Sequence, residues 1–229
     1  DDGIPDFNDV SLTQNTRGSY PLESIENRIF ESKGGLPHNV VFLTCDAFGV
    51  LPPISKLTPS QAAYHFISGY TAKVAGTEIG VFEPQATFST CFGAPFMPMH
   101  PSVYADLLSK KVAENNSSCW LLNTGWVAGG FSKSGRIKIK WTRALLNAAL
   151  NNLFQDVEFV VDERFKFQVP TSCEGVPSEI MQPRNSWENK SDYDKTANRL
   201  VNMFNENFKN FSSGCSDAVL SASPRVIDE

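Results

Sequence analysis

The chain lacks the features of a membrane protein and of a nucleic-acid-binding protein. No apolar run approaches the roughly 18 residues that a membrane-spanning helix requires, and no signal-peptide pattern opens the sequence. The 229 residues carry a net charge of −5 without a basic tract, which disfavours nucleic acid as a partner. We expect a cytoplasmic globular protein. The start at Asp1, without methionine, indicates a fragment or part of a longer chain.

Cysteine and histidine are also sparse and scattered. The five cysteines are odd in number, widely spaced and free of any C-x-x-C pair, so reduced thiols are expected and a zinc site is not. His38, His65 and His100 are isolated, and no His/Asp/Glu cluster has metal-ligand spacing. We expect His65 to face outward from its helix. No Gly-x-Ser-x-Gly elbow or Cys/His pairing indicates a nucleophilic enzyme.

Periodicity and capping signals predict an α/β domain. The apolar run at residues 39–44 is typical of a strand buried on both faces. Thr58, Pro59 and Gln61 predict a capped helix that runs to about residue 74. Further helices are expected from residue 101, from about 142 to 153, and from about 192 to 211. The expected apolar face of the first helix is formed by Ala63, Phe66, Ile67, Tyr70 and Val74. The second helix carries Val103, Tyr104 and Leu107, and one face of the last helix carries Ala197, Leu200, Val201, Phe204 and Phe208.

The most informative segment is the Asn123-Thr124-Gly125-Trp126 sequence and the glycine/serine loop that follows it. The loop leads to Arg136, and residues 136–143 alternate in polarity, which predicts a second strand. A guanidinium beside flexible backbone is suited to an anion or to stacking on a flat ring. We therefore expect a nucleotide or a phosphorylated ligand.

The same loop has the glycine spacing of a phosphate-binding P-loop between Gly130 and Gly135. That motif requires Lys and then Ser/Thr after the last glycine, at the start of a helix. Here Arg136 and Ile137 follow, so the spacing is not interpreted as a P-loop.

Other candidate residues leave alternatives open. Arg17 could point into a cleft or into solvent. Asp46, at the end of the first predicted strand, could belong to a site or could cap the turn that follows. Glu78 and Glu83 could form an acid/base pair, but solvated loop carboxylates are the simpler interpretation.

Several ordered segments resemble ATP-dependent phosphoenolpyruvate carboxykinases, from about residue 6 to about residue 211. The matching segments are Asn15-Thr16-Arg17 with Tyr20-Pro21, residues 46–58, 64–73 and 75–78, Glu83-Pro84, Cys91-Phe92-Gly93 and Asn123-Thr124-Gly125-Trp126. The resemblance implies that residues 1–229 form the C-terminal part of a mononucleotide-binding catalytic domain, with a mixed sheet that is incomplete without upstream residues. It assigns no role to residues 212–229.

The resemblance also implies site residues. Arg17 matches the arginine that contacts the terminal phosphate of ATP and the substrate anion, and would act in catalysis. Arg136 and Ile137 match residues that hold adenine, within a loop and strand at residues 125–143. Thr142 matches a threonine that hydrogen-bonds the nucleotide. Residues 76–93 correspond to the lid.

The reaction implied is oxaloacetate plus ATP giving phosphoenolpyruvate, CO2 and ADP, in gluconeogenesis, with Mg²⁺ and Mn²⁺. The family's P-loop, its metal ligands and its oxaloacetate-binding residues are expected upstream, so this chain needs that N-terminal part and should be inactive alone. It could be part of a homo-oligomer, since the family includes several oligomeric states. Two alternatives remain: a non-catalytic nucleotide-binding or interaction fragment, and a GTP-dependent carboxykinase.

Overall fold

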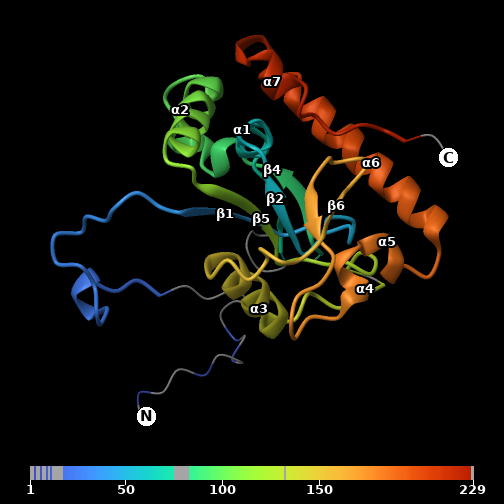
Figure 1. The fold of residues 1–229 in the computed structure, drawn as a ribbon, viewed down its shortest axis with the longest axis horizontal. Coiled ribbons are helices and arrows are strands. Elements are labelled where there is room, and N and C mark those ends of the chain that lie inside the picture. Colours follow the sequence, from blue (N-terminus) through green and yellow to red (C-terminus); the bar gives the residue numbers. More distant parts are fainter. Residues whose placement is uncertain are drawn as a thin grey trace.

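A mixed five-stranded sheet forms the centre of the computed structural model, which describes residues 18–74, 83–131 and 133–227, and the single residues 3, 6, 9 and 11 (Figure 1). The strand order is β1-β5-β2-β7-β6, where β1 and β5 are parallel and the other pairs are antiparallel. A separate hairpin pairs β3 with β4. The strands are β1 (Asn39–Thr44), β2 (Ile54–Leu57), β3 (Tyr70–Lys73), β4 (Gln85–Phe88), β5 (Ser118–Asn123), β6 (Phe159–Val161) and β7 (Gln168–Pro170). The expected α/β class with a mixed sheet is confirmed.

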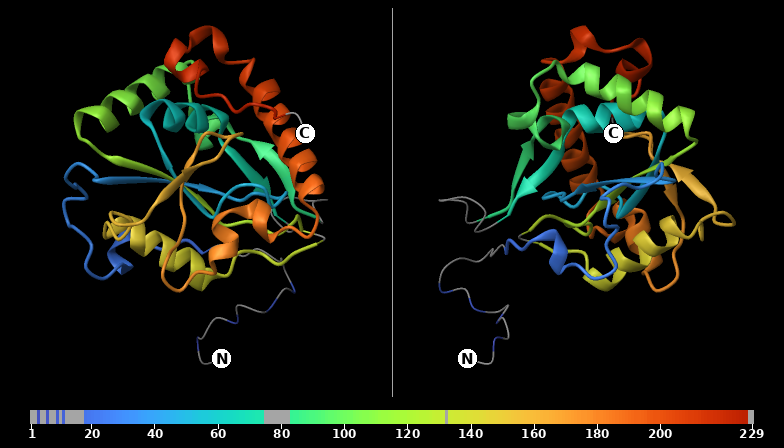
Figure 2. Two further views of the ribbon diagram at one scale, coloured as in Figure 1. Left: turned by 45° about the vertical axis from the view of Figure 1, so that its right-hand side comes forward. Right: turned by 90° about the vertical axis from the view of Figure 1, so that its left-hand side faces the viewer.

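Helices cover both faces of the sheet (Figure 2). The α-helices are α1 (Pro59–Ser68), α2 (Pro101–Glu114), α3 (Ile139–Leu150), α4 (Ser178–Met181), α5 (Pro183–Ser186), α6 (Lys190–Phe208) and α7 (Asp217–Leu220). Short 3-10 helices lie at Leu22–Ser24, Thr90–Phe92, Ala94–Phe96 and Ser212–Gly214. None of the helices in the described ranges is long and apolar enough to span a membrane.

Strand β5 divides the core into two clusters, because its side chains alternate between the two faces of the sheet. Cys119 and Leu121 belong to the cluster under α1, α2 and α6, whereas Trp120 and Leu122 belong to the cluster under α3 and α4. The expectation that residues 39–44 are buried on both faces is wrong, since β1 is an edge strand and Leu43 is 60% exposed.

Helix α1 begins as predicted but ends earlier. Thr58 and Gln61 form the predicted capping box. Gly69 then takes a left-handed conformation with φ of 55°, and a Cβ there would lie 1.7 Å from the Ser89 carbonyl oxygen. The chain turns at this glycine, so Tyr70 opens β3 instead of continuing the helix.

The predicted orientation of His65 is wrong, whereas the predicted apolar face of the last helix is confirmed. The side chain of His65 is 2% exposed, not outward, and packs against three aromatic rings. In α2, Val103 and Leu107 are exposed, while Ala105 and Val112 are buried. The last predicted helix is α6, which ends at Phe208 and not at residue 211. All five of its predicted apolar residues are buried.

The strand predicted at residues 136–143 is wrong. Helix α3 begins at Ile139, because the Lys138 carbonyl oxygen accepts hydrogen bonds from the Trp141 and Thr142 N–H groups. The helix buries Leu145, an apolar position that the alternating pattern does not include. Strand β2 was not predicted either.

Candidate nucleotide site

The candidate site lies at the carboxyl ends of the parallel strands β1 and β5. Residues that follow β1 and β5 meet there, at Cys45 and Asp46 and at Thr124 and Gly125. The Thr124 N–H donates to the Thr44 carbonyl oxygen at 2.8 Å, and the Trp126 N–H donates to the Asp46 carbonyl oxygen at 3.0 Å. Ligands in open α/β sheets bind beyond the carboxyl ends of strands, so this edge is the expected position.

Asn123 joins the two loops through a side-chain amide whose donors and acceptor all form hydrogen bonds. Its Oδ1 accepts hydrogen bonds from the Asp46 N–H at 3.0 Å and the Gly125 N–H at 2.8 Å. Its Nδ2 donates to the Leu51 and Trp126 carbonyl oxygens, both at 3.1 Å. Asn123 is fully buried, so it fixes the loops instead of contacting a ligand.

Asp46 caps the turn that follows β1. Of the two roles considered for it, ligand binding and turn capping, the structure shows the second. Its carboxylate accepts the N–H groups of Phe48, Val50 and Leu51 at 2.9, 2.6 and 2.8 Å, and the Tyr70 hydroxyl at 2.8 Å. Burial raises the pKa of Asp46, and these hydrogen bonds oppose that shift. Both carboxylate oxygens are occupied, so Asp46 is an organising residue.

Gly125 is required where the two loops touch. A Cβ at this position would lie 2.3 Å from the Asp46 carbonyl oxygen and 2.4 Å from the Asp46 nitrogen. Any side chain would therefore force the loops apart. The Gly125 carbonyl oxygen accepts the Ile137 N–H at 2.8 Å, which ties the far end of the 127–135 loop back to its start.

Arg136 places an exposed positive charge at the candidate site. Its Nε donates to the Thr124 carbonyl oxygen at 2.9 Å, and its guanidinium carbon lies 5.8 Å from the Trp126 ring centroid. These contacts hold the side chain over the site while it remains exposed. Burial raises the pKa of the neighbouring Cys45 thiol, and the Arg136 charge opposes the shift.

The other predicted site residues are placed differently. Ile137 is 6% exposed and its side chain belongs to the core cluster under α3. Thr142 is half-buried in the first turn of α3, so it approaches from a helix and not from a strand shared with Arg136. Arg17 lies outside the described residues. The roles of all four residues stay predictions.

The lid prediction falls partly on described residues. Residues 75–82, which include Glu78, lie outside them, while β4 and the following turns belong to the hairpin region. Glu83 is exposed. The glycine/serine loop is held by a Phe131–Trp126 ring contact and by a Lys133–Asp192 ion pair at 3.9 Å.

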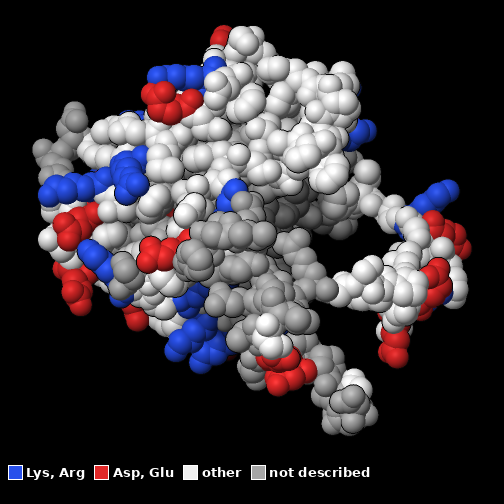
Figure 3. All heavy atoms as spheres, turned by 180° about the vertical axis from the view of Figure 1, so that it is seen from behind, with Lys and Arg blue, Asp and Glu red and all other residues white. Residues whose placement is uncertain are grey.

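Charged groups are interspersed on the molecular surface. Figure 3 shows Lys/Arg and Asp/Glu side chains mixed across one face. Within the described ranges, no three His, Cys, Asp or Glu side chains are grouped so that they could hold a metal ion.

The chain is similar to phosphoenolpyruvate carboxykinases over most of its length. The family model described as phosphoenolpyruvate carboxykinase matches residues 1–179. A phosphoenolpyruvate carboxykinase (ATP) of Geobacter sp. (strain M21) is 57% identical over 216 residues, which are 94% of this chain and 41% of that relative. The protein of the same name from Brucella anthropi is 56% identical over 222 residues, 97% of this chain and 41% of its own length.

The chain thus spans about two fifths of the length of the curated relatives that it matches. A family model that covers residues 1–179, together with identity above one half over nearly the whole chain, confirms the resemblance read from the motifs. The chain belongs to the phosphoenolpyruvate carboxykinase family.

Proposed function

We propose that this chain is the adenine-binding part of an ATP-dependent phosphoenolpyruvate carboxykinase. The observation that carries the proposal is Arg136, held by the Thr124 carbonyl oxygen beside Trp126 at the carboxyl ends of β1 and β5. A planar guanidinium fixed in this way can stack on a purine ring. The names of the relatives agree with ATP as the nucleotide.

In the proposed reaction, oxaloacetate loses CO2 to give an enolate, whose oxygen attacks the terminal phosphate of ATP. Phosphoenolpyruvate and ADP are the products, as a gluconeogenic enzyme would require. Arg136 and Thr142 would hold the nucleoside, and Arg17 would stabilise charge on the transferred phosphoryl group. Closure of residues 76–93 would exclude water from the enolate.

Mg²⁺ and Mn²⁺ would stabilise the phosphates and the enolate in such a reaction. The described residues at this site do not fit a metal, because the Asp46 oxygens are taken up by backbone N–H groups and Tyr70. We therefore assign metal binding to the remainder of the enzyme and derive no step through a metal here.

We further propose that the remainder of the enzyme covers the segment before β1. Residues 20–36 of this segment stand away from the rest of the fold (Figure 1), and their large apolar side chains are exposed instead of packed. An exposed apolar stretch of this kind marks an interaction surface. The exposed residues are Tyr20, Leu22, Ile25, Ile29, Phe30 and Leu36.

Replacing Arg136 with alanine should weaken ATP binding to the chain by about tenfold, because loss of a cation stacked on a ring costs about 1–2 kcal/mol. Isothermal titration calorimetry with ATP measures this directly. Arg143→Ala is the matched control, since Arg143 is an exposed arginine of α3. Equal ATP affinity of the Arg136 variant and the parent would contradict the proposed role, and equal affinity for GTP would contradict the ATP preference.

The purified 229-residue chain should not convert oxaloacetate and ATP to phosphoenolpyruvate, although it should bind ATP. The longer carboxykinase polypeptide should catalyse this conversion. A coupled assay of phosphoenolpyruvate formation distinguishes the two. Turnover by the chain alone would refute the proposal that catalysis needs residues outside it. A lack of turnover by the longer protein would refute the proposed activity.

A further inference from the structure

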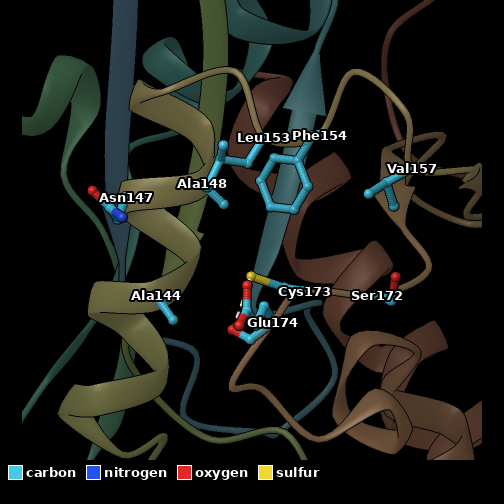
Figure 4. A pocket seen from close by; sticks show the side chains of 9 residues that line it. All are labelled: Ala144, Asn147, Ala148, Leu153, Phe154, Val157, Ser172, Cys173 and Glu174. Atoms are coloured by element: carbon cyan, nitrogen blue, oxygen red, sulfur yellow. Dashed lines mark hydrogen bonds between the residues drawn. The ribbon is translucent and has the colours of Figure 1, made fainter.

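A cavity whose lining includes neither Arg136 nor Thr142 lies against α3. It has a volume of about 560 Å³ and opens between the second half of α3, residues 153–157 and residues 172–174 (Figure 4). Small-molecule sites commonly have volumes of roughly 300–1,000 Å³. Neither Arg136, Ile137 nor Thr142 lines this cavity, so its occupant would be distinct from the nucleotide.

The walls of the cavity are apolar and well supported. Ala144 and Ala148 of α3 form one side, and Phe154 and Val157 form the other. The Phe154 ring is 5% exposed and packs against Trp120 at 5.5 Å between centroids. Since that ring is fixed from behind by the core, the cavity is preformed.

Three polar side chains, those of Ser172, Cys173 and Glu174, line the cavity on the side that faces α3, and Glu174 is exposed at its mouth. In Figure 4, Cys173 and Glu174 point toward α3, whereas Asn147 points away from the cavity. The Asn147 Oδ1 already accepts a hydrogen bond from the Asn151 side chain at 2.8 Å. The cavity therefore offers a ligand one carboxylate, one thiol and the Ser172 hydroxyl, and Glu174 is the one charged residue in its lining.

The Glu174 carboxylate has no counter-ion in the described part of the chain. Among the described residues no ion pair includes it, and no other charged residue lines the cavity. A carboxylate beside apolar walls is complementary to a cation that carries an apolar body, because the charge pairs while the body is removed from water. A neutral or anionic ligand would lack one of these two contributions.

We propose that this cavity binds a small organic cation: an aromatic ring or short apolar chain that bears an ammonium or amidinium group. The apolar part lies between Phe154 and the two alanines of α3, and the charged group pairs with Glu174. This site does not depend on the proposed carboxykinase activity.

The test uses 2-phenylethylammonium as the probe and Cys173 as the reporter. The chain reacts with N-ethylmaleimide with and without the probe, and mass spectrometry of the peptides gives the rate at each cysteine. We expect saturating probe to slow alkylation of Cys173 by at least about fivefold, because a bound ligand blocks access to a half-buried thiol. Cys215, half-buried elsewhere, is the internal control and its rate should not change.

Glu174→Gln keeps the shape and removes the charge, and it should weaken protection by the probe about fivefold to tenfold. Burial raises the pKa of the Cys173 thiol and the Glu174 charge adds to the shift, so the variant changes the unprotected rate as well. The quantity compared is therefore the ratio of rates with and without the probe. Glu179→Gln, an exposed carboxylate on α4, is the matched control.

Two further measurements separate this site from general binding. Ala144→Phe should fill the cavity and remove protection, while its melting temperature shows that the fold is kept. The neutral analogue 2-phenylethanol should protect about tenfold less well than the cation. The proposal is overturned if Cys173 is not protected, if Cys215 is slowed equally, or if the alcohol or the Glu174 variant gives the same protection.

Discussion

Replacing Asp46 with alanine should lower the free energy of unfolding by about 3–5 kcal/mol, the largest effect expected of a single substitution outside the apolar core. The carboxylate is fully buried and accepts three backbone N–H groups and the Tyr70 hydroxyl. Alanine would leave these donors without partners in the interior, and each unsatisfied buried donor costs about 1–3 kcal/mol before water enters. Urea unfolding followed by circular dichroism measures the loss.

Three controls resolve the origin of the effect. Tyr70→Phe removes the hydroxyl that donates to Asp46 and leaves the carboxylate bonded to its three backbone N–H groups, so it should lower the free energy of unfolding by only about 1–2 kcal/mol. Asp46→Asn should lie between the two, because one oxygen remains while its NH2 group faces N–H donors. Asp106→Ala on the exposed face of α2 should change stability by less than about 0.5 kcal/mol.

The same substitution should weaken ATP binding even in the folded fraction. Asp46 and Asn123 together hold the loops from which Arg136 projects, since the Arg136 Nε is bonded to the Thr124 carbonyl oxygen. If Asp46→Ala unfolded at the urea concentration of the parent, the turn would not depend on this carboxylate and the account of the site would fail.

Signals that act within a few residues were predictable from the sequence. The capping box at Thr58 is complete within one helical turn, and the apolar stripe of α6 repeats over several turns, so both were found. The end of α1 was missed because Tyr70 and Val74 also fit a helical repeat. Gly69 ends the helix where it meets the backbone of Ser89, a residue brought close only by the fold.

The region after Arg136 shows how a pattern can fit two structures. Residues 136–143 alternate in polarity and fit a strand, yet Ile139 is 72% exposed at the start of a helix. The deciding contacts come later in the chain, where Leu145 and Ala149 pack against the cluster that contains Leu122. Tertiary packing therefore overrode local alternation.

The candidate site was predicted mainly from a sequence motif shared with a family, and less from the physical properties of its residues. A loop beside an arginine indicated an anion or a ring, but nothing in the local sequence marked Asn123 as the side chain that joins two loops. Its partners, Asp46 and Leu51, lie more than 70 residues away along the chain. Contacts between residues so far apart in the sequence are not indicated by local patterns, whereas a motif shared with a family can indicate them.

Acid should destabilise the protein through His65 at pH values where the accessible carboxylates are still ionised. The His65 ring is buried among Tyr64, Phe167 and Phe204, and its Nε2 has no hydrogen-bond partner within the part of the chain that the structure describes. Burial lowers the pKa of His65 from 6.5 to about 3. The unfolded chain therefore binds a proton below pH 6.5 that the folded chain does not bind until about pH 3, so stability falls as the pH is lowered through this window.

Between pH 7 and pH 5 the loss due to His65 should be about 2 kcal/mol, since each pH unit below 6.5 costs about 1.4 kcal/mol. For a chain of this size the melting temperature would fall by about 4–8 °C. His65→Leu removes the titrating group and the unpaired nitrogen, so its melting temperature should change much less over the same range. Differential scanning calorimetry from pH 7 to pH 5 measures both proteins.

The comparison between parent and variant isolates His65 from the other buried groups. Burial also raises the pKa values of Asp46 and Asp162, and a carboxyl with a raised pKa takes up its proton in the folded state first, which stabilises the fold as the pH falls. These carboxyls oppose the histidine equally in both proteins. His38→Leu, at an exposed position, should follow the parent profile. If the melting temperatures of His65→Leu and the parent changed with pH in parallel, the folded protein would tolerate a charged imidazole at this position. The assignment of the acid sensitivity to the buried His65 ring would then be wrong.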